Sequence, residues 1–410
     1  MAKVKTLLRA SLPPSLLPHP SPGSLQSTRL AAHMGGEGSY CCIYIASGGN
    51  VYTAQISMTG NMVLQGKESL LIPMHTQVMA ASGVYRCPHR AEIQSVALSN
   101  ASCDGQFLLG TVDSYGNIIV SALESDAEDA ERITYTASPQ DSGVGEGGWA
   151  GINFNPSQNS MVAVARSLCK SIDLYDRDIH IRTLHTIVII ACSWSTNNIL
   201  SIARQFGLWH PTSLCFLTSS YFGEGNSSVL AVTEGSHLSI WDLRTNQQGG
   251  CVQRVSGSSG DPLYAVCSSS YGFVGTGGAE RSAVIFDHRR WSILSRWTGC
   301  LKYEITGLMF SDVNPDFLYV HGLDYEVVCG RWRGKPQRSF SFRGDSSWLG
   351  FNKCSNLDVI AGWCESGSIF VAEVVQENSM DQNETSNAGD VTMVNASSLS
   401  MPETCIDTLV

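Results

Sequence analysis

A chain of 410 residues with 43% hydrophobic and 15% charged residues can bury a sizeable core, which excludes a wholly disordered protein. The formal net charge of −10 argues against general binding of nucleic acid, because phosphate binding needs a basic surface. The 14 cysteines include no CxxC pair and no cluster with histidine at zinc-ligand spacing. We therefore expect no metal site, no cofactor and reduced thiols.

The first 39 residues differ in composition from the rest of the chain. Lys3, Lys5, Arg9 and Arg29 precede any acidic residue, and Ser, Leu and Pro are frequent. This composition predicts a disordered leader over residues 1–39, and it also fits an organellar transit segment over residues 1–33 or translation that starts at Met34. Reduced cysteines without a secretory signal predict the nucleus or cytoplasm; a transit segment would instead predict a plastid or mitochondrion.

One pattern then recurs from residue 40 to residue 375: an apolar strand, a polar turn and a second alternating strand, often ended by an aromatic residue and Asp. The seven copies cover residues 42–55, 108–121, 161–176, 229–242, 273–287, 317–331 and 359–373. The last three spacings between their ends are 45, 44 and 42 residues, which is the period of propeller repeats. Insertions over 124–148 and 185–210 lengthen the earlier spacings. Within the second, residues 187–210 are irregular, either a short hydrophobic helix at the edge or an artefact of the gene model.

Further alternating segments flank most copies. Inner strands are predicted over residues 92–98, 149–154, 212–217, 263–267, 305–310 and 348–351, and outer strands over 133–136, 179–184, 251–255 and 338–342. The first copy has no evident inner strand, which the leader or a tail segment such as 391–394 could supply. Four short strands repeated seven times predict an all-β, seven-bladed β-propeller over residues 40–375, followed by a disordered tail over 376–410.

Two copies carry a more specific signature. Residues 239–244 read SIWDLR and residues 284–289 read VIFDHR. These endings resemble WD40 repeat proteins, and the resemblance covers about residues 40–375. It implies structural roles for the aromatic-Asp positions, which are Tyr175, Asp176, Trp241, Asp242, Phe286 and Asp287. The chain departs from the family in lacking the Gly-His dipeptide and the buried Ser/Thr-His-Asp set that often locks a blade, so we expect no such lock.

The chemistry-bearing motifs of enzymes are absent from the sequence. It contains no G-x-S-x-G, H-E-x-x-H, G-x-x-x-x-G-K-[ST] or G-x-G-x-x-G. The predicted inner strands also offer few titratable groups, so an enzyme with a site in the central channel is the weaker alternative. We expect no catalytic residues, no small-molecule substrate and no membrane span, and predict a non-enzymatic scaffold for protein–protein interactions.

The resemblance also suggests a partner. WD-x-R endings on consecutive blades are characteristic of substrate receptors that dock on the DDB1 adaptor of cullin-4 ubiquitin ligases. Arg244 and Arg289 occupy the arginine position of two consecutive copies, 45 residues apart, and are the candidate partner-binding residues. Alternatively, both arginines pair with carboxylates of their own blade, and the chain is a structural subunit of another multiprotein assembly.

Three other segments are candidates for partner binding. The acidic run over residues 126–131 is a solvated loop or a docking strip for a basic partner, and the basic run over residues 331–335 is a blade end or a nucleic-acid site. Thr408 and Val410 form a C-terminal pattern of the kind that PDZ domains accept.

Overall fold

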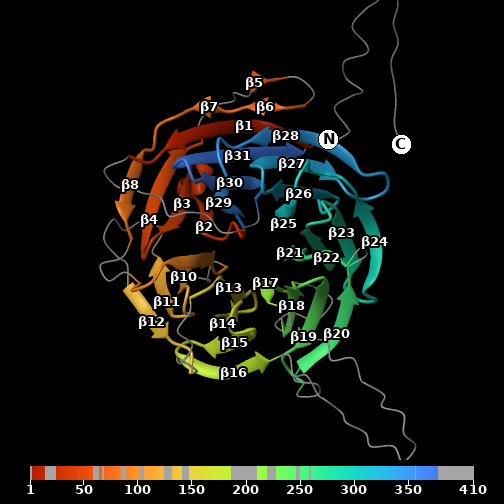
Figure 1. The fold of residues 1–410 in the computed structure, drawn as a ribbon. Helices are drawn as coiled ribbons and strands as arrows, with labels where there is room; N and C mark the ends of the chain where they lie inside the picture. The colour runs from red at the N-terminus through yellow and green to blue at the C-terminus, as the bar shows by residue number, and fades with distance from the viewer. Residues whose placement is uncertain are drawn as a thin grey trace, which may run out of the picture. The chain divides into compact units, whose positions relative to one another are not determined.

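The computed structural model describes residues 2–376 except 14–24, 59–63, 67–68, 85–88, 101–105, 124–131, 141–146, 186–209, 219–227, 246–249, 258–259 and 356. Within these residues, seven antiparallel sheets stand around a central axis as the blades of a ring (Figure 1). The only helix of the described residues is a short 3-10 turn, η1 (Gly36–Gly38).

Each blade consists of four strands that follow one another from the axis outward. Blade 1 holds β2 (Leu30–Gly35), β3 (Tyr40–Ser47), β4 (Asn50–Ser57) and β8 (Ala80–Gly83); blade 2 holds β9 (Ile93–Leu98), β10 (Phe107–Asp113), β11 (Ile118–Leu123) and β12 (Arg132–Ala137). Blade 3 holds β13 (Ala150–Asn155), β14 (Gln158–Arg166), β15 (Ser171–Asp176) and β16 (Ile179–His185); blade 4 holds β17 (Pro211–Phe216), β18 (Val229–Glu234), β19 (His237–Asp242) and β20 (Cys251–Ser256).

The remaining blades follow the same order. Blade 5 holds β21 (Leu263–Ser268), β22 (Phe273–Gly278), β23 (Ala283–Asp287) and β24 (Ser292–Trp297); blade 6 holds β25 (Ile305–Phe310), β26 (Phe317–Gly322), β27 (Glu326–Arg331) and β28 (Gln337–Arg343). Blade 7 holds β29 (Trp348–Lys353), β30 (Val359–Cys364), β31 (Ser368–Gln376) and β1 (Ala2–Ser11). The predicted all-β, seven-bladed propeller is confirmed, and all seven predicted strand pairs, with the predicted inner and outer strands, lie where the alternation placed them.

The prediction of a disordered leader is wrong for the described part of residues 1–39. β1 pairs with β31 along its length, from Ala2 opposite Gln376 to Ser11 opposite Ser368, and supplies the fourth strand of blade 7. β2, which lies within residues 1–39, supplies the inner strand of blade 1. The leader was one of the two predicted sources of this strand. The propeller therefore begins at residue 2 rather than residue 40. The composition of β1 was misleading because its exposed positions carry the lysines while Leu7 is fully buried.

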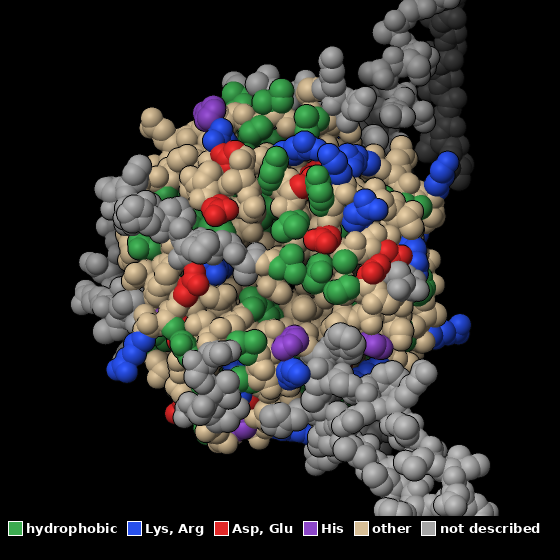
Figure 2. Space-filling model, in the orientation of Figure 1, with side chains coloured by type: hydrophobic (Ala, Val, Ile, Leu, Met, Phe, Trp, Pro, Cys, Tyr) green, Lys and Arg blue, Asp and Glu red, His purple; other side chains and the backbone are tan. Residues whose placement is uncertain are grey.

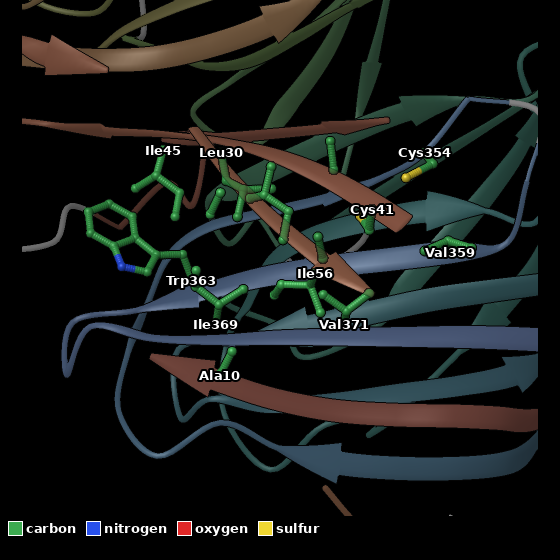
Figure 3. Packing of buried hydrophobic residues seen from close by; sticks show 14 of the residues in the cluster. Ala10, Leu30, Cys41, Ile45, Ile56, Cys354, Val359, Trp363, Ile369 and Val371 are labelled. Carbon is green, nitrogen blue, oxygen red and sulfur yellow. The ribbon is translucent and has the colours of Figure 1, made fainter. Parts of the chain in front are cut away.

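The N-terminal segment also joins the inner edge of blade 7. The Arg29 amide donates to the carbonyl of Leu349 at 3.1 Å, and the Phe351 amide donates to the carbonyl of Ser27 at 3.0 Å. A shared hydrophobic cluster, which includes Cys41 and Trp363, fills the junction of blades 1 and 7 (Figure 3). The first and last blades are thus connected at both edges and through their packed faces.

A long excursion from blade 1 covers outer edges of the last two blades. Between β4 and β8 lie β5 (Leu64–Gln65), β6 (Leu71–Ile72) and β7 (Met74–His75). β7 pairs in parallel with β1, and Leu70 forms a bridge with Ser341 of β28 (Figure 1). Pairing in this way removes open strand edges, which otherwise invite association with other chains.

The prediction that no buried Ser/Thr-His-Asp set locks a blade is wrong for blade 2. His89 lies in the connection before β9, with Nε2 2.8 Å from the Thr111 hydroxyl and Nδ1 3.5 Å from the Asp113 carboxylate. All three side chains are buried. Burial raises the pKa of Asp113, but hydrogen bonds from His89 and Asn117 outweigh it and leave the pKa below its usual value. The local sequence does not mark this set, because Pro and not Gly precedes His89.

Candidate binding face of blades 4 to 6

Three arginines occupy equivalent positions in consecutive blades. The second and third strands of these blades pair in one register, with Val229 opposite Asp242, Phe273 opposite Asp287 and Phe317 opposite Arg331. Two residues beyond the end of each third strand stand Arg244, Arg289 and Arg333, all exposed. Since third strands of all blades run in the same sense, these arginines share the face formed by the turns after the first and third strands. We call it the arginine face.

Arg244 pairs with a carboxylate of its own turn. Its Nε and Nη2 donate to the two oxygens of Asp242 at 2.9 and 2.8 Å, and its amide donates to Asp242 at 3.0 Å. These bonds hold the pKa of Asp242 below its usual value. In blade 5 the amide of Arg289 donates to Asp287 at 2.9 Å. The local pairing expected as the alternative is therefore present at Arg244, while 58% of its side chain remains exposed.

Arg333 is held between two blades. Its guanidinium is 3.0 Å from Asp316 of its own blade and lies 5.1 Å from the ring centre of Phe273 in blade 5. The neighbouring Trp332 is buried and donates from its indole to the Pro315 carbonyl at 2.7 Å. A guanidinium stacked on an aromatic ring is ordered before a ligand arrives, which reduces the entropy cost of binding.

The sequence pattern alone does not group Arg333 with the other two arginines. Blade 6 has Gly330 and Arg331 where the preceding blades have an aromatic residue and Asp. A Cβ at Gly330 would lie 2.3 Å from the Trp297 ring of blade 5, so that ring occupies the space of the missing aromatic side chain. Arg331 follows Asp287 by 44 residues, which is the repeat spacing. Arg333 follows Arg331 by two residues, as Arg289 follows Asp287, and this spacing identifies Arg333 as the equivalent arginine.

Positive charge exceeds negative charge on this part of the arginine face. The third turns of blades 5 and 6, residues 287–291 and 331–336, carry Arg289, Arg290, Arg331, Arg333 and Lys335 against Asp287. The first turn of blade 6 adds two further carboxylates, those of Asp316, which contacts Arg331 and Arg333, and of Asp312, which contacts Lys353. This surplus stands in a chain of net charge −10. On the face drawn in Figure 2, by comparison, acidic and basic side chains are interspersed around hydrophobic side chains near the ring centre.

Comparison with known proteins agrees with this architecture. No protein-family model and no curated protein matches the chain. Among solved structures, a chain of the "Crystal Structure of Mitotic Checkpoint Complex" is similar with a TM-score of 0.59 and 13% identity, over 91% of this chain and 92% of that chain. The chain has a seven-bladed β-propeller fold. At this identity the likeness concerns the fold alone.

The aromatic residues of the aromatic-Asp positions lie in the packing between blades. Tyr175, Trp241 and Phe286 are buried in three different inter-blade clusters. The Trp241 indole donates to the Ser239 hydroxyl at 3.0 Å. Asp176, Asp242 and Asp287 are half-buried at the strand ends. Trp241 and Asp242 therefore position the turn that carries Arg244, and Phe286 and Asp287 position the turn that carries Arg289.

Polar groups near the axis of the propeller bond to one another. Arg29, buried, pairs with Glu92 at 2.7 Å, and the Trp149 indole donates to the Thr28 hydroxyl at 3.2 Å. Arg29 belongs to the predicted leader, whereas Glu92 is the first residue of the inner strand predicted over residues 92–98.

A second buried hydroxyl–histidine arrangement, besides Thr111, His89 and Asp113 of blade 2, joins Ser27 and His321. The Ser27 hydroxyl is 3.4 Å from Nε2 of His321, whose Nδ1 is 3.2 Å from the Thr306 hydroxyl rather than from a carboxylate. Burial lowers the pKa of His321 to about 3, which makes it a weak base. The pair therefore gives no support to the alternative of an enzyme.

Several sequence predictions fall outside the described residues: the acidic run over 126–131, the segment 187–209, and Thr408 with Val410. Within the described part of the chain, no three His, Cys, Asp or Glu side chains are placed to hold a metal ion. Likewise, no helix there is long and apolar enough to cross a membrane.

Proposed function

We propose that this WD40-type propeller is a non-enzymatic scaffold that binds a protein partner through the arginine face. The observation that carries the proposal is the row of Arg244, Arg289 and Arg333 at equivalent positions of three consecutive blades. Equivalent positions on rigid blades present the guanidinium groups at regular intervals. Each group can donate two parallel hydrogen bonds to a carboxylate or to backbone carbonyls of a partner.

In its finer form, the proposal is that the partner is the DDB1 adaptor and that the chain is a substrate receptor of cullin-4 ubiquitin ligases. The WD-x-R endings at Arg244 and Arg289 support it, as does the 58% exposure of the Arg244 side chain. Docking would require Arg244 to share or exchange its bonds with Asp242. The alternative is a structural subunit of another assembly that uses the same face.

The test is capture of purified adaptor by the full-length chain and by an Arg244→Ala/Arg289→Ala variant. Each lost charge-assisted contact should cost about 1.5–3 kcal/mol, so the variant should bind at least about tenfold more weakly. The matched control is Arg281→Ala/Lys302→Ala, which removes two exposed charges on the opposite face. Arg281 lies in the turn between β22 and β23, and Lys302 lies in the connection between β24 and β25.

The outcomes separate the two levels of the proposal. Absence of adaptor capture by the wild type, or equal capture by the arginine variant, contradicts the ligase receptor. For the scaffold itself, proteins captured from cell extract by the wild type and the control should be lost from an Arg244→Ala/Arg289→Ala/Arg333→Ala variant. Equal capture by all three chains contradicts the arginine face as the docking surface.

A further inference from the structure

The arginine face of the later blades carries a second row of side chains, closer to the axis. The turns after the first strands of blades 5, 6 and 7 present Tyr271, Val313 and Leu357, which are 50%, 55% and 44% exposed. Single exposed apolar residues are ordinary on protein surfaces, whereas three at the first turns of consecutive blades form a pattern.

These first turns share a face with the arginine-bearing third turns. In blade 5 the amide of His288 donates to the carbonyl of Gly272, next to Tyr271, at 3.3 Å. In blade 6 the amide of Trp332, next to Arg333, donates to the carbonyl of Asp316 at 2.9 Å. First turns join the two innermost strands and third turns join the two outermost, so the apolar row is the inner row (Figure 1).

Hydrogen bonds hold together the turns that carry two of the three apolar side chains, Val313 and Leu357. Asp358 of blade 7 accepts the Ser311 hydroxyl and, at 3.0 Å, the Asp312 amide of blade 6. Lys353 bonds Asp312 and also donates to the Leu357 carbonyl at 3.5 Å. This network connects the turns that carry Val313 and Leu357. A prearranged surface loses little conformational entropy on binding.

We propose that the two rows together form a docking site for an acidic amphipathic segment of a partner protein. Leu, Ile or Phe side chains of the segment would contact Tyr271, Val313 and Leu357, and its Asp or Glu side chains would contact Arg289 and Arg333. The inference rests on the proposed function and names the chemistry of its partner. The apolar row favours a peptide over nucleic acid, whose backbone offers phosphates but no aliphatic side chains.

The probe is a fluorescent peptide of about 20 residues, built from Leu, Glu and Ala with Leu along one helical face and Glu along the other. The control peptide has the same composition in scrambled order. Fluorescence anisotropy with the full-length chain should show at least about tenfold tighter binding of the amphipathic peptide. A single-stranded oligonucleotide should compete poorly with it.

Two variants test the rows separately. Val313→Ser/Leu357→Ser removes apolar surface without changing charge, and Arg289→Ala/Arg333→Ala removes charge; each should weaken binding about tenfold. The matched control is Leu323→Ser/Tyr303→Ser on the opposite face, where the side chains are 43% and 47% exposed. Its binding should equal that of the wild type, and thermal unfolding checks that every variant is folded.

Equal binding of the scrambled peptide, unchanged binding by the Val313/Leu357 variant, or preferential binding of the oligonucleotide would overturn the inference. These failures are distinguishable from failure of the proposed function. If protein capture depends on Arg244 and Arg289 while peptide binding ignores the apolar row, only the two-row site is wrong. If neither capture nor peptide binding responds to the arginine variants, the arginine face is not a docking surface.

Discussion

His321 shows how one buried side chain couples the fold to pH. It lies between Thr306 and Ser27 with its ring against Phe351, and burial lowers its pKa to about 3. In the unfolded chain a histidine titrates near pH 6.5. Between these values the unfolded chain binds a proton that the folded chain does not, so the stability contributed by neutral His321 is present above about pH 6.5 and lost as the pH falls.

We therefore predict that His321→Gln flattens the acid side of the stability profile. For wild-type protein, the free energy of unfolding should decrease by about 1.4 kcal/mol per pH unit below pH 6.5 on account of this group. The variant, which keeps a hydrogen-bonding side chain, should lack that part of the decrease whatever its stability at pH 7. Urea unfolding at pH 7, 6, 5 and 4 measures it; identical slopes for the two proteins would contradict the prediction.

β1 contributes to the stability of the propeller by pairing with β31, a strand near the other end of the chain. Its inward side chains join the cluster between blades 6 and 7, where Leu7 lies with Phe342 and Phe370. Its outward Lys5 forms an exposed ion pair with Glu373 at 2.8 Å. The strand is thus anchored by buried area rather than by its surface charges.

Substitutions on adjacent faces of β1 should differ in effect. Leu7→Ala removes a fully buried side chain and should lower the free energy of unfolding by about 2–5 kcal/mol. Lys5→Ala removes an exposed ion pair and should cost less than about 1 kcal/mol. Thermal and urea unfolding compare them; a Leu7→Ala protein as stable as the Lys5→Ala protein would show that β1 contributes little to the ring.

Closure of the whole ring depends on the first 35 residues. β1 covers the outer edge of blade 7, and residues 27–29 cover its inner edge before the chain enters β2. A chain that started at Met34 would leave β31 and β29 with open edges and would leave blade 1 without most of its inner strand. Removal of residues 1–33 as a transit segment would have the same effect. We accordingly propose that the intact chain resides in the nucleus or cytoplasm.

Comparison of the full-length chain with one that starts at Met34 tests whether the first 33 residues are needed to close the ring. The shorter chain should unfold at a lower temperature and scatter light as it aggregates, because open strand edges recruit other chains. A peptide of the β1 sequence added in trans should partly restore stability. With a fluorescent protein fused to its C-terminus, the full-length chain should appear in the nucleus or cytoplasm. Equal stability of the two chains would contradict the role of residues 1–33 in the ring. Import of the longer chain into an organelle would contradict the proposed location.

The sequence by itself determined the features that depend on local pattern. Period-two alternation located the strands, and the spacing of 42–45 residues identified the repeating blade, because both express how neighbouring residues are buried. Arg244 and Arg289 were found because Trp241, Asp242, Phe286 and Asp287 mark the ends of their strands. Arg333 shares their position without that mark.

Tertiary structure alone decided the features that join distant residues. Ala2 lies opposite Gln376, and His89 contacts Thr111 and Asp113, which are more than 20 residues away in the sequence. No local sequence pattern predicts either contact. The pairing of an inner apolar row with an outer arginine row likewise exists only once the first and third turns of a blade meet at one end of its sheet. The residue pattern of a strand predicts which of its side chains are buried. The strand with which it pairs depends on which sheet edges remain open when the ring closes.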